Sequence, residues 1–194
     1  MLKSATHPRW FATASRNLGA LLSDHLHCER KAAENALSLV RRYPTDGEAA
    51  LALGRLAHEE TSHVIQVAEL LASRGLAPRA DSPNRYARAL FEQMRPREPG
   101  HKLDALIVAA LIEARSHERL RLLEHGFAAR AAPGDDELAG FYRTLANAED
   151  RHAEIFLGLA ARVAPADEVA ARVSALAARE AEILAALPFS SRVH

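Results

Sequence analysis

Two short motifs pair a carboxylate with an imidazole at the same spacing. Glu60 and His63 lie three residues apart, and so do Glu149 and His152. In an α-helix, three residues span about 300°, so both side chains of each pair lie on the same face. Carboxylate and imidazole together are common ligands of transition-metal ions. If the surrounding residues are helical, each motif therefore predicts part of a metal site.

The apolar residues around these motifs predict which face of each helix is buried. They recur at alternating steps of three and four, which is the pattern of a helix with one buried stripe. Both motifs fall within that stripe, at a level where residues above and below are apolar. Two further segments place a single glutamate in their stripes in the same way. The sequence thus predicts four carboxylates and two imidazoles at one level of a helical core, namely Glu29, Glu60, His63, Glu113, Glu149 and His152.

The charge of this set is the strongest argument for a metal. Four buried carboxylates without counter-charge would each cost several kcal/mol and would take up protons instead. Two divalent cations supply four positive charges, and mixed carboxylate and imidazole ligation suits iron or manganese. The alternative is that these residues form surface pairs on solvated faces. Two copies of the motif, each with a partner glutamate on the preceding helix, favour a dinuclear site.

Two more histidines lie in the same stripes. His25 is four residues before Glu29, and His117 is four residues after Glu113. Both are predicted either to lie beside the site or to be hydrogen-bonded core histidines, and the second interpretation is favoured.

Five long helices must position these residues. Proline, glycine and capping residues predict them at about 16–42, 47–75, 100–131, 135–163 and 165–187, with Thr45 or Asp46 as the cap of the second. A long connection, 76–99, separates the second from the third and includes a short helix starting at Ser82-Pro83. Short links elsewhere and one long crossover are typical of ferritin-like bundles. We therefore predict an all-α fold: a ferritin-like four-helix bundle with a long crossover between helices two and three and an extra C-terminal helix, in a single domain of residues 1–194.

Composition narrows the class of protein. The chain has 25 basic and 25 acidic residues, so it lacks a global polyanion-binding signature. Its single cysteine, Cys28, allows no disulfide within the chain, which fits a reducing compartment. The N-terminus has no apolar core of a signal peptide, and no apolar run approaches the ~18 residues of a membrane span. We expect a soluble cytoplasmic protein with no membrane partner.

Four segments resemble one known family. DHLHCERKAAENAL (24–37), HEETSHVIQVAELL (58–71), ALIEARSHERLRLL (110–123) and FYRTLANAEDRHAEIFLGLA (141–160) are similar to the tRNA hydroxylases called MiaE. The resemblance implies a ferritin-like, non-haem diiron monooxygenase that hydroxylates the isopentenyl group of 2-methylthio-N6-isopentenyladenosine in tRNA. It implies two iron ions as cofactor, O2 as co-substrate, an external electron donor such as a reductase, and the tRNA anticodon loop as partner.

Carried over residue by residue, the implied iron ligands are the six residues already named. His117 stands where the family is expected to have cysteine, and Val64 where it is expected to have an aromatic residue. Tyr142, Leu145 and Phe156, on the stripe beside Glu149 and His152, are then the place to look for the substrate, although core packing is the default for each.

Basic residues supply a weak independent indication of RNA. Between positions 74 and 102 there are seven basic and three acidic residues, and the first sixteen residues carry Lys3, Arg9 and Arg16 with no acid. Such patches can hold phosphates, although a solvated surface explains them equally well. Two other functions use the same ligand set: a ferritin-like protein that binds or stores iron, and a peroxide-scavenging diiron protein.

Overall fold

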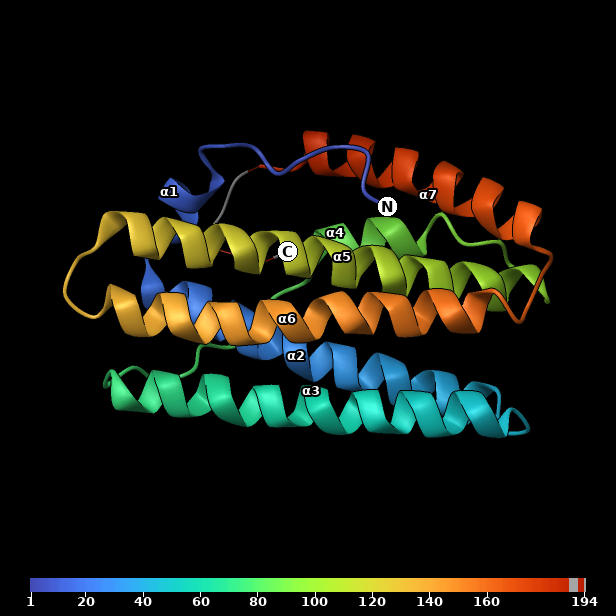
Figure 1. Ribbon diagram of the computed structural model, residues 1–194, viewed down its shortest axis with the longest axis horizontal. Coiled ribbons are helices and arrows are strands. Elements are labelled where there is room, and N and C mark those ends of the chain that lie inside the picture. Colours follow the sequence, from blue (N-terminus) through green and yellow to red (C-terminus); the bar gives the residue numbers. More distant parts are fainter. Residues whose placement is uncertain (189–191, 194) are drawn as a thin grey trace. The chain divides into compact units, whose positions relative to one another are not determined.

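The protein is described here by a computed structural model that covers residues 1–188 and 192–193. Within those residues the secondary structure is helical, without strands (Figure 1). The helices are α1 (Trp10–Ala14), α2 (Leu18–Arg42), α3 (Gly47–Ser73), α4 (Arg85–Phe91), α5 (Gly100–Arg130), α6 (Asp135–Ala160) and α7 (Ala166–Ala186). The all-α prediction is confirmed, including the long connection, the short helix within it and the extra C-terminal helix.

Capping explains where the two helices that carry Glu29 and Glu60 begin. The Asn17 side chain accepts a hydrogen bond from the backbone of Ala20 at the start of α2, and Asp46 accepts one from Ala49 at the start of α3. Asp46, rather than Thr45, is therefore the cap. The five-residue helix α1 was not predicted, because so short a segment offers little apolar periodicity.

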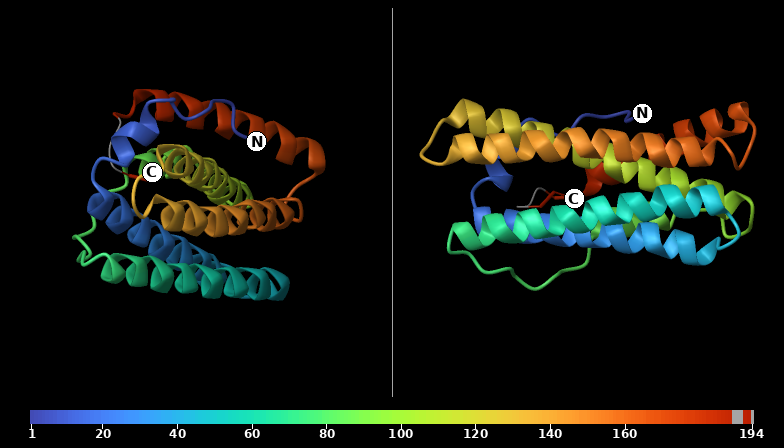
Figure 2. Two further views of the ribbon diagram at one scale, coloured as in Figure 1. Left: turned by 60° about the vertical axis from the view of Figure 1, so that its left-hand side comes forward. Right: turned by 60° about the horizontal axis from the view of Figure 1, so that its bottom comes forward.

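The chain forms two compact units, and the prediction of a single domain for residues 1–194 stays a prediction. The first to be described, the α2–α3 unit, comprises residues 12–83 together with 192–193. Its two helices are antiparallel and lie side by side in Figures 1 and 2. The short link 43–46 joins them. The predicted stripes are largely buried, so the pairing brings the polar residues of both helices to the same level.

The α5–α6 unit comprises residues 1–11 and 84–188. Helices α5 and α6 are an antiparallel pair joined by a tight turn, in which Ala131 has a positive φ of 50° and Gly134 one of 84°. Helices α4 and α7 also pack against α5. Because α5 has neighbours on several sides, it is buried around most of its circumference.

A buried ion pair fixes α7 on α5 close to Glu113. The side chains of Arg115 and Glu180 are both fully buried. Arg115 Nε and Nη2 donate to the two carboxylate oxygens of Glu180 at 2.9 and 3.0 Å, and Tyr86 of α4 donates to the same carboxylate at 2.9 Å. Each charge thus has a partner, as burial requires. These contacts fix α4, α5 and α7 relative to one another, and Arg115 is only two residues from the predicted ligand Glu113.

None of the described helices is both long and apolar enough to pass through a lipid bilayer.

Candidate metal centre

The α2–α3 unit brings three of the predicted ligands together. Ligand atoms of Glu29, Glu60 and His63 lie within 4.8 Å of one another, and all three residues are buried. His63 Nδ1 is 3.3 Å from Glu29 Oε2 and 3.5 Å from Glu60 Oε2. The spacing of three residues therefore does place Glu60 and His63 on one face, as predicted.

The contacts within this triad shift two pKa values. Burial disfavours the charged imidazole of His63, but the contacts with Glu29 and Glu60 outweigh it and raise its pKa to about 9. Burial would raise the pKa of Glu29, yet the charge of His25 and the contacts with His25 and His63 lower it well below the usual range. The raised pKa of His63 and the lowered pKa of Glu29 mean that the imidazole and the carboxylate stabilise each other's charged forms.

His25 lies directly beside Glu29. Its Nε2 atom is 2.5 Å from Glu29 Oε1, and both side chains are almost completely buried. Glu29 therefore faces His25 with one carboxylate oxygen and His63 with the other. His25 is therefore a buried histidine in contact with a predicted ligand, and its membership of the site stays a prediction.

The α5–α6 unit carries a second set of the same composition. Ligand atoms of Glu113, Glu149 and His152 lie within 4.8 Å of one another, and all three residues are buried. His152 Nδ1 is 3.9 Å from Glu149 Oε2. Each unit thus carries a buried triad of two carboxylates and one imidazole.

His117 has a different environment from His25. Its Nδ1 atom lies 2.8 Å from the backbone oxygen of Ala146, so it links α5 to α6. The residue is only partly buried. His117 is therefore a hydrogen-bonded histidine, as favoured from the sequence, and its partner Ala146 lies three residues before Glu149 on α6.

The three residues expected near the substrate are all buried in α6. Tyr142 and Phe156 are fully buried, and Leu145 nearly so. The Tyr142 ring stacks on Phe127 at 5.7 Å between centroids and meets Phe141 edge-on at 5.4 Å. These contacts are those of a packed core, so a role in binding substrate stays a prediction.

The donor set fits iron. Each triad presents hard carboxylate oxygens and an imidazole nitrogen, without a thiolate, a combination suited to divalent iron or manganese. Carboxylates buried to this degree are stable as anions only with counter-charge, which a divalent ion provides. The chemistry of the residues therefore agrees with the predicted metal.

One solved structure is similar to this protein over the whole chain. "Protein 43 with aldehyde deformylating oxygenase activity from Synechococcus" has a TM-score of 0.91 and 34% sequence identity, and the match covers 100% of this chain and 94% of that one. Together with the helix order, this similarity confirms the predicted all-α, ferritin-like fold class.

Sequence comparison identifies two relatives with the same name. A protein of Pseudomonas putida (strain KT2440) is 38% identical over 189 residues, which cover 97% of this chain and 89% of the relative. One from Salmonella typhimurium (strain LT2) is 31% identical, covering 100% of this chain and 87% of the relative. Both are named tRNA 2-(methylsulfanyl)-N(6)-isopentenyladenosine(37) hydroxylase. The model of the family described as tRNA-(MS[2]IO[6]A)-hydroxylase (MiaE) matches residues 1–194, and the chain belongs to that family.

Proposed function

We propose that the protein is a diiron, O2-dependent monooxygenase that hydroxylates the isopentenyl group of 2-methylthio-N6-isopentenyladenosine in tRNA. The observation that carries this proposal is a buried Glu–Glu–His triad in each of the two helix pairs of a chain that belongs to the hydroxylase family. The two relatives named above carry the name of this activity.

We further propose that the two triads together hold two iron ions. The ligands would be Glu29, Glu60, His63, Glu113, Glu149 and His152. Support comes from their burial, from the repeated Glu-x-x-His spacing, and from the balance between four carboxylates and two divalent ions. The bound iron would supply the redox chemistry with O2 that inserts oxygen into an unactivated C–H bond.

The stoichiometry of the hydroxylation shows that the enzyme needs a source of electrons. One C–H bond becomes C–OH, the second oxygen atom leaves as water, and two electrons and two protons are consumed. The chain has no flavin or iron–sulfur motif to store those electrons. The proposal therefore includes an external electron donor, such as a reductase, as a second partner. A tRNA substrate also favours the cytoplasm as the site of action.

The protein residues have a more limited task, which is positioning and exclusion of water. His25 would hold one oxygen of Glu29 so that the other stays directed toward His63. Tyr142, Leu145 and Phe156 would give the site an apolar wall on the side of α6, as a prenyl group requires.

Mass spectrometry of nucleosides tests the proposal. Iron-loaded protein, a chemical reductant and tRNA carrying the prenylated nucleoside should give a product heavier by one oxygen, with the label derived from 18O2. Glu149→Gln should abolish the product, whereas Glu154→Gln, at an exposed position on the same helix, should not. Unchanged nucleosides in tRNA from a strain lacking the gene would contradict the tRNA function.

A second candidate function follows from the similar solved structure, whose title gives aldehyde deformylating oxygenase activity. The same iron-loaded protein would then convert an aldehyde with loss of its formyl carbon. Supplying an aliphatic aldehyde in place of tRNA decides between the two substrates, because only one of them should be consumed at a catalytic rate.

A further inference from the structure

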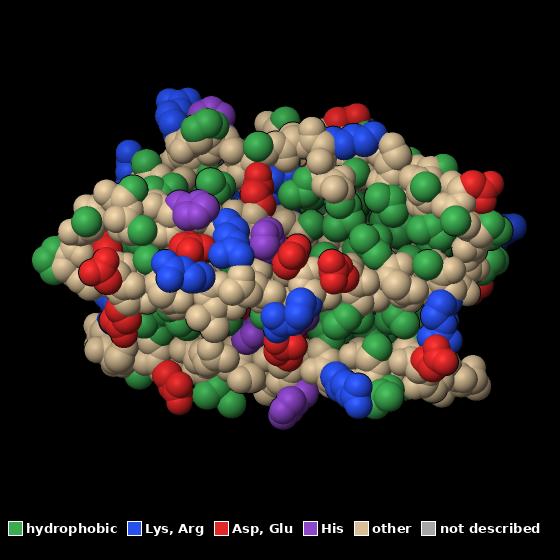
Figure 3. Space-filling view, viewed as in Figure 1, with side chains coloured by type: hydrophobic (Ala, Val, Ile, Leu, Met, Phe, Trp, Pro, Cys, Tyr) green, Lys and Arg blue, Asp and Glu red, His purple; other side chains and the backbone are tan. Residues whose placement is uncertain are grey.

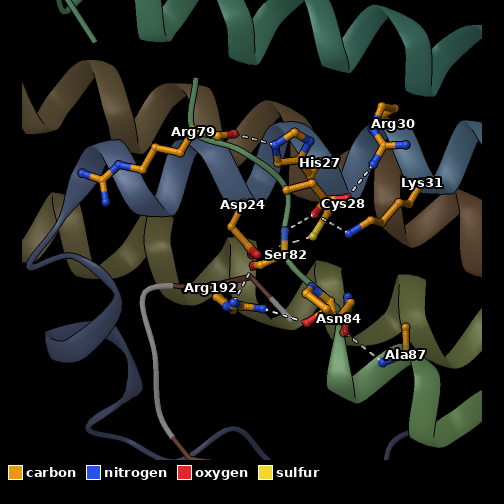
Figure 4. Close-up of polar contacts among 12 residues, drawn as sticks. Asp24, His27, Cys28, Arg30, Lys31, Arg79, Ser82, Asn84, Ala87 and Arg192 are labelled. Atoms are coloured by element: carbon orange, nitrogen blue, oxygen red, sulfur yellow. Dashed lines mark hydrogen bonds and ion pairs between the residues drawn. The ribbon is translucent and has the colours of Figure 1, made fainter. Parts of the chain in front are cut away.

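We propose that one outer face of the α2–α3 unit binds RNA backbone phosphates through Arg79 and Arg16. This inference rests on the proposed function, and it adds the surface by which the tRNA would be held. The face is formed by α2 and by the part of the crossover that lies on it, residues 76–83, called the strap below (Figure 4).

The strap is fixed to α2 by hydrogen bonds from both backbone and side chains. The Arg79 backbone N–H donates to Ser23 Oγ at 3.0 Å, and the Arg79 carbonyl oxygen is 2.8 Å from His27 Nε2. Further along, the Asp81 carboxylate is bound by Arg30 at 2.8 Å and by Lys31 at 2.7 Å. The backbone of Arg79 is therefore ordered by contacts on both sides.

The Arg79 guanidinium is positioned by a hydrogen bond to an uncharged side chain, so its positive charge is not compensated. In Figure 4 its side chain extends away from His27, and its Nη2 atom donates to the Asn17 side-chain oxygen at 3.2 Å. Asn17 is uncharged, and it follows Arg16, whose side chain is exposed. Over the described part of the chain, neither Arg16 nor Arg79 is paired with a carboxylate.

A third cation lies at the other end of the strap. Arg192 donates to Ser82 Oγ at 2.6 Å and to the Pro83 carbonyl oxygen at 3.1 Å. The neighbouring Val193 N–H donates to Asp24 Oδ2 at 2.7 Å. Asn17 and Asp24 are seven residues apart, or about 10 Å along α2. Because Asp24 also interacts with the charge of Arg192, the phosphate contacts are assigned to Arg79 and Arg16 at the first end of the strap.

Ion pairing distinguishes Arg79 from two other arginines of the basic crossover, Arg88 and Arg95. Arg95 is bound to the buried Asp104 and to Glu168, and Arg88 is paired with Glu92, so neither carries an uncompensated charge. The face shown in Figure 3 has acidic and basic side chains interspersed, without an extended basic area. The strap instead offers a planar guanidinium that is already positioned, which lowers the entropy cost of binding phosphate.

The test is the salt dependence of RNA binding. Affinity for a fluorescent anticodon stem-loop RNA would be measured by anisotropy at several KCl concentrations, for the wild type, Arg79→Gln, Arg16→Gln and the double variant. Each substitution should raise Kd about 3- to 10-fold near 0.1 M salt and lower the slope of log K against log salt by about 0.7. Arg79→Lys should keep the slope and only part of the affinity.

The matched control is Arg55→Gln, at an exposed position on α3, which should leave Kd and slope unchanged. A double variant with wild-type Kd and slope would overturn the inference, and so would a weaker Kd with an unchanged slope, because that result indicates a purely structural effect. Circular dichroism of each variant verifies folding. If the wild type hydroxylates tRNA but the variants bind normally, the surface is wrong and the function stands; if the wild type neither binds nor hydroxylates tRNA, both are wrong.

Discussion

The contact between His25 and Glu29 makes the α2–α3 triad different from its counterpart. Glu29 has an imidazole one helical turn before it, whereas the residue four positions before Glu113 is Ala109. The two triads therefore consist of the same residue types, but only Glu29 has a histidine one helical turn before it. Replacing a group that hydrogen-bonds to a metal ligand typically lowers the metal affinity by 10- to 100-fold.

We predict that His25→Gln weakens iron binding by about 10- to 100-fold while the helical content stays the same. The physical reason is that Glu29 loses the imidazole that orients its carboxylate. Competition with a chromophoric chelator measures the affinity. His58→Gln, at an exposed position on α3, is the control and should bind iron as the wild type does. Equal affinities of the two variants would contradict the role of His25.

A second residue-scale prediction concerns Glu60, which is fully buried in α3. Glu60→Gln removes a charged ligand with little change of volume, so purified protein should retain about one iron or less in place of two. Ferrous iron at 100 times its Kd should stabilise the wild type by about 2.7 kcal/mol per occupied site against unfolding, and the variant by much less. Iron analysis and thermal unfolding with and without iron measure both effects. Wild-type iron content in the variant would remove Glu60 from the ligand set.

At the scale of elements, α7 is bound to α5 by ion pairs of residues that are not among the predicted metal ligands. Arg115 and Glu180 form the buried pair described above, and Arg172 of α7 binds the buried Asp104 of α5 at 2.7 Å. Helix α5 carries Glu113 between these two contacts. Its position in the unit thus depends on α7 as well as on α6.

Glu180→Gln should destabilise the protein by up to about 3–5 kcal/mol, because the buried Arg115 loses its buried partner and keeps only the partly exposed Glu118. Urea unfolding measures the change. Glu182→Gln on the same helix is the control: Glu182 and its partner Arg179 are both exposed, so the expected loss is under about 1 kcal/mol. Replacing Arg115 and Glu180 together by leucine should recover much of the stability. A Glu180→Gln protein as stable as the control would contradict the assignment.

At the scale of the whole molecule, acid stability follows from carboxylates that are ion-paired after folding. Burial acts to raise the pKa of Asp104, but the hydrogen bonds from Arg172 and Arg95 outweigh it and lower that pKa below its ordinary value. A carboxyl group whose pKa is lower in the folded state contributes stability that is fully present above the unfolded pKa of about 3.9 and is lost as the pH falls through the folded pKa.

Asp104→Asn should therefore lower stability at neutral pH, and the difference from the wild type should shrink below about pH 4. Circular dichroism during urea unfolding at pH 7 and at pH 3.5 measures this convergence. A difference that stays constant between the two pH values would show that Asp104 contributes through packing rather than through its charge.

The long helices and their buried faces could be predicted from local features of the sequence. Apolar periodicity, prolines and caps are local properties, so the long helices and the stripes containing Glu29, Glu60, Glu113 and Glu149 could be predicted from the sequence. The period of the helix alone requires Glu60 and His63 to share a face, as it does Glu149 and His152. The short helix α1 was not predicted because its five residues make fewer than two turns, too few to show a repeat of apolar positions.

The partners of charged side chains were decided only by tertiary structure. The charge count between 74 and 102 treats Arg79 and Arg95 alike, yet Arg95 is bound to Asp104 and Glu168 whereas Arg79 is held by an uncharged asparagine. In the same way, His25 and His117 have similar positions in their stripes but contact a carboxylate and a backbone carbonyl, respectively. The sequence by itself determined which carboxylates and imidazoles share a buried helix face, because helical geometry is local. The packing of distant segments determined which charges remain available, because each ion pair needs a partner that only the folded chain brings near.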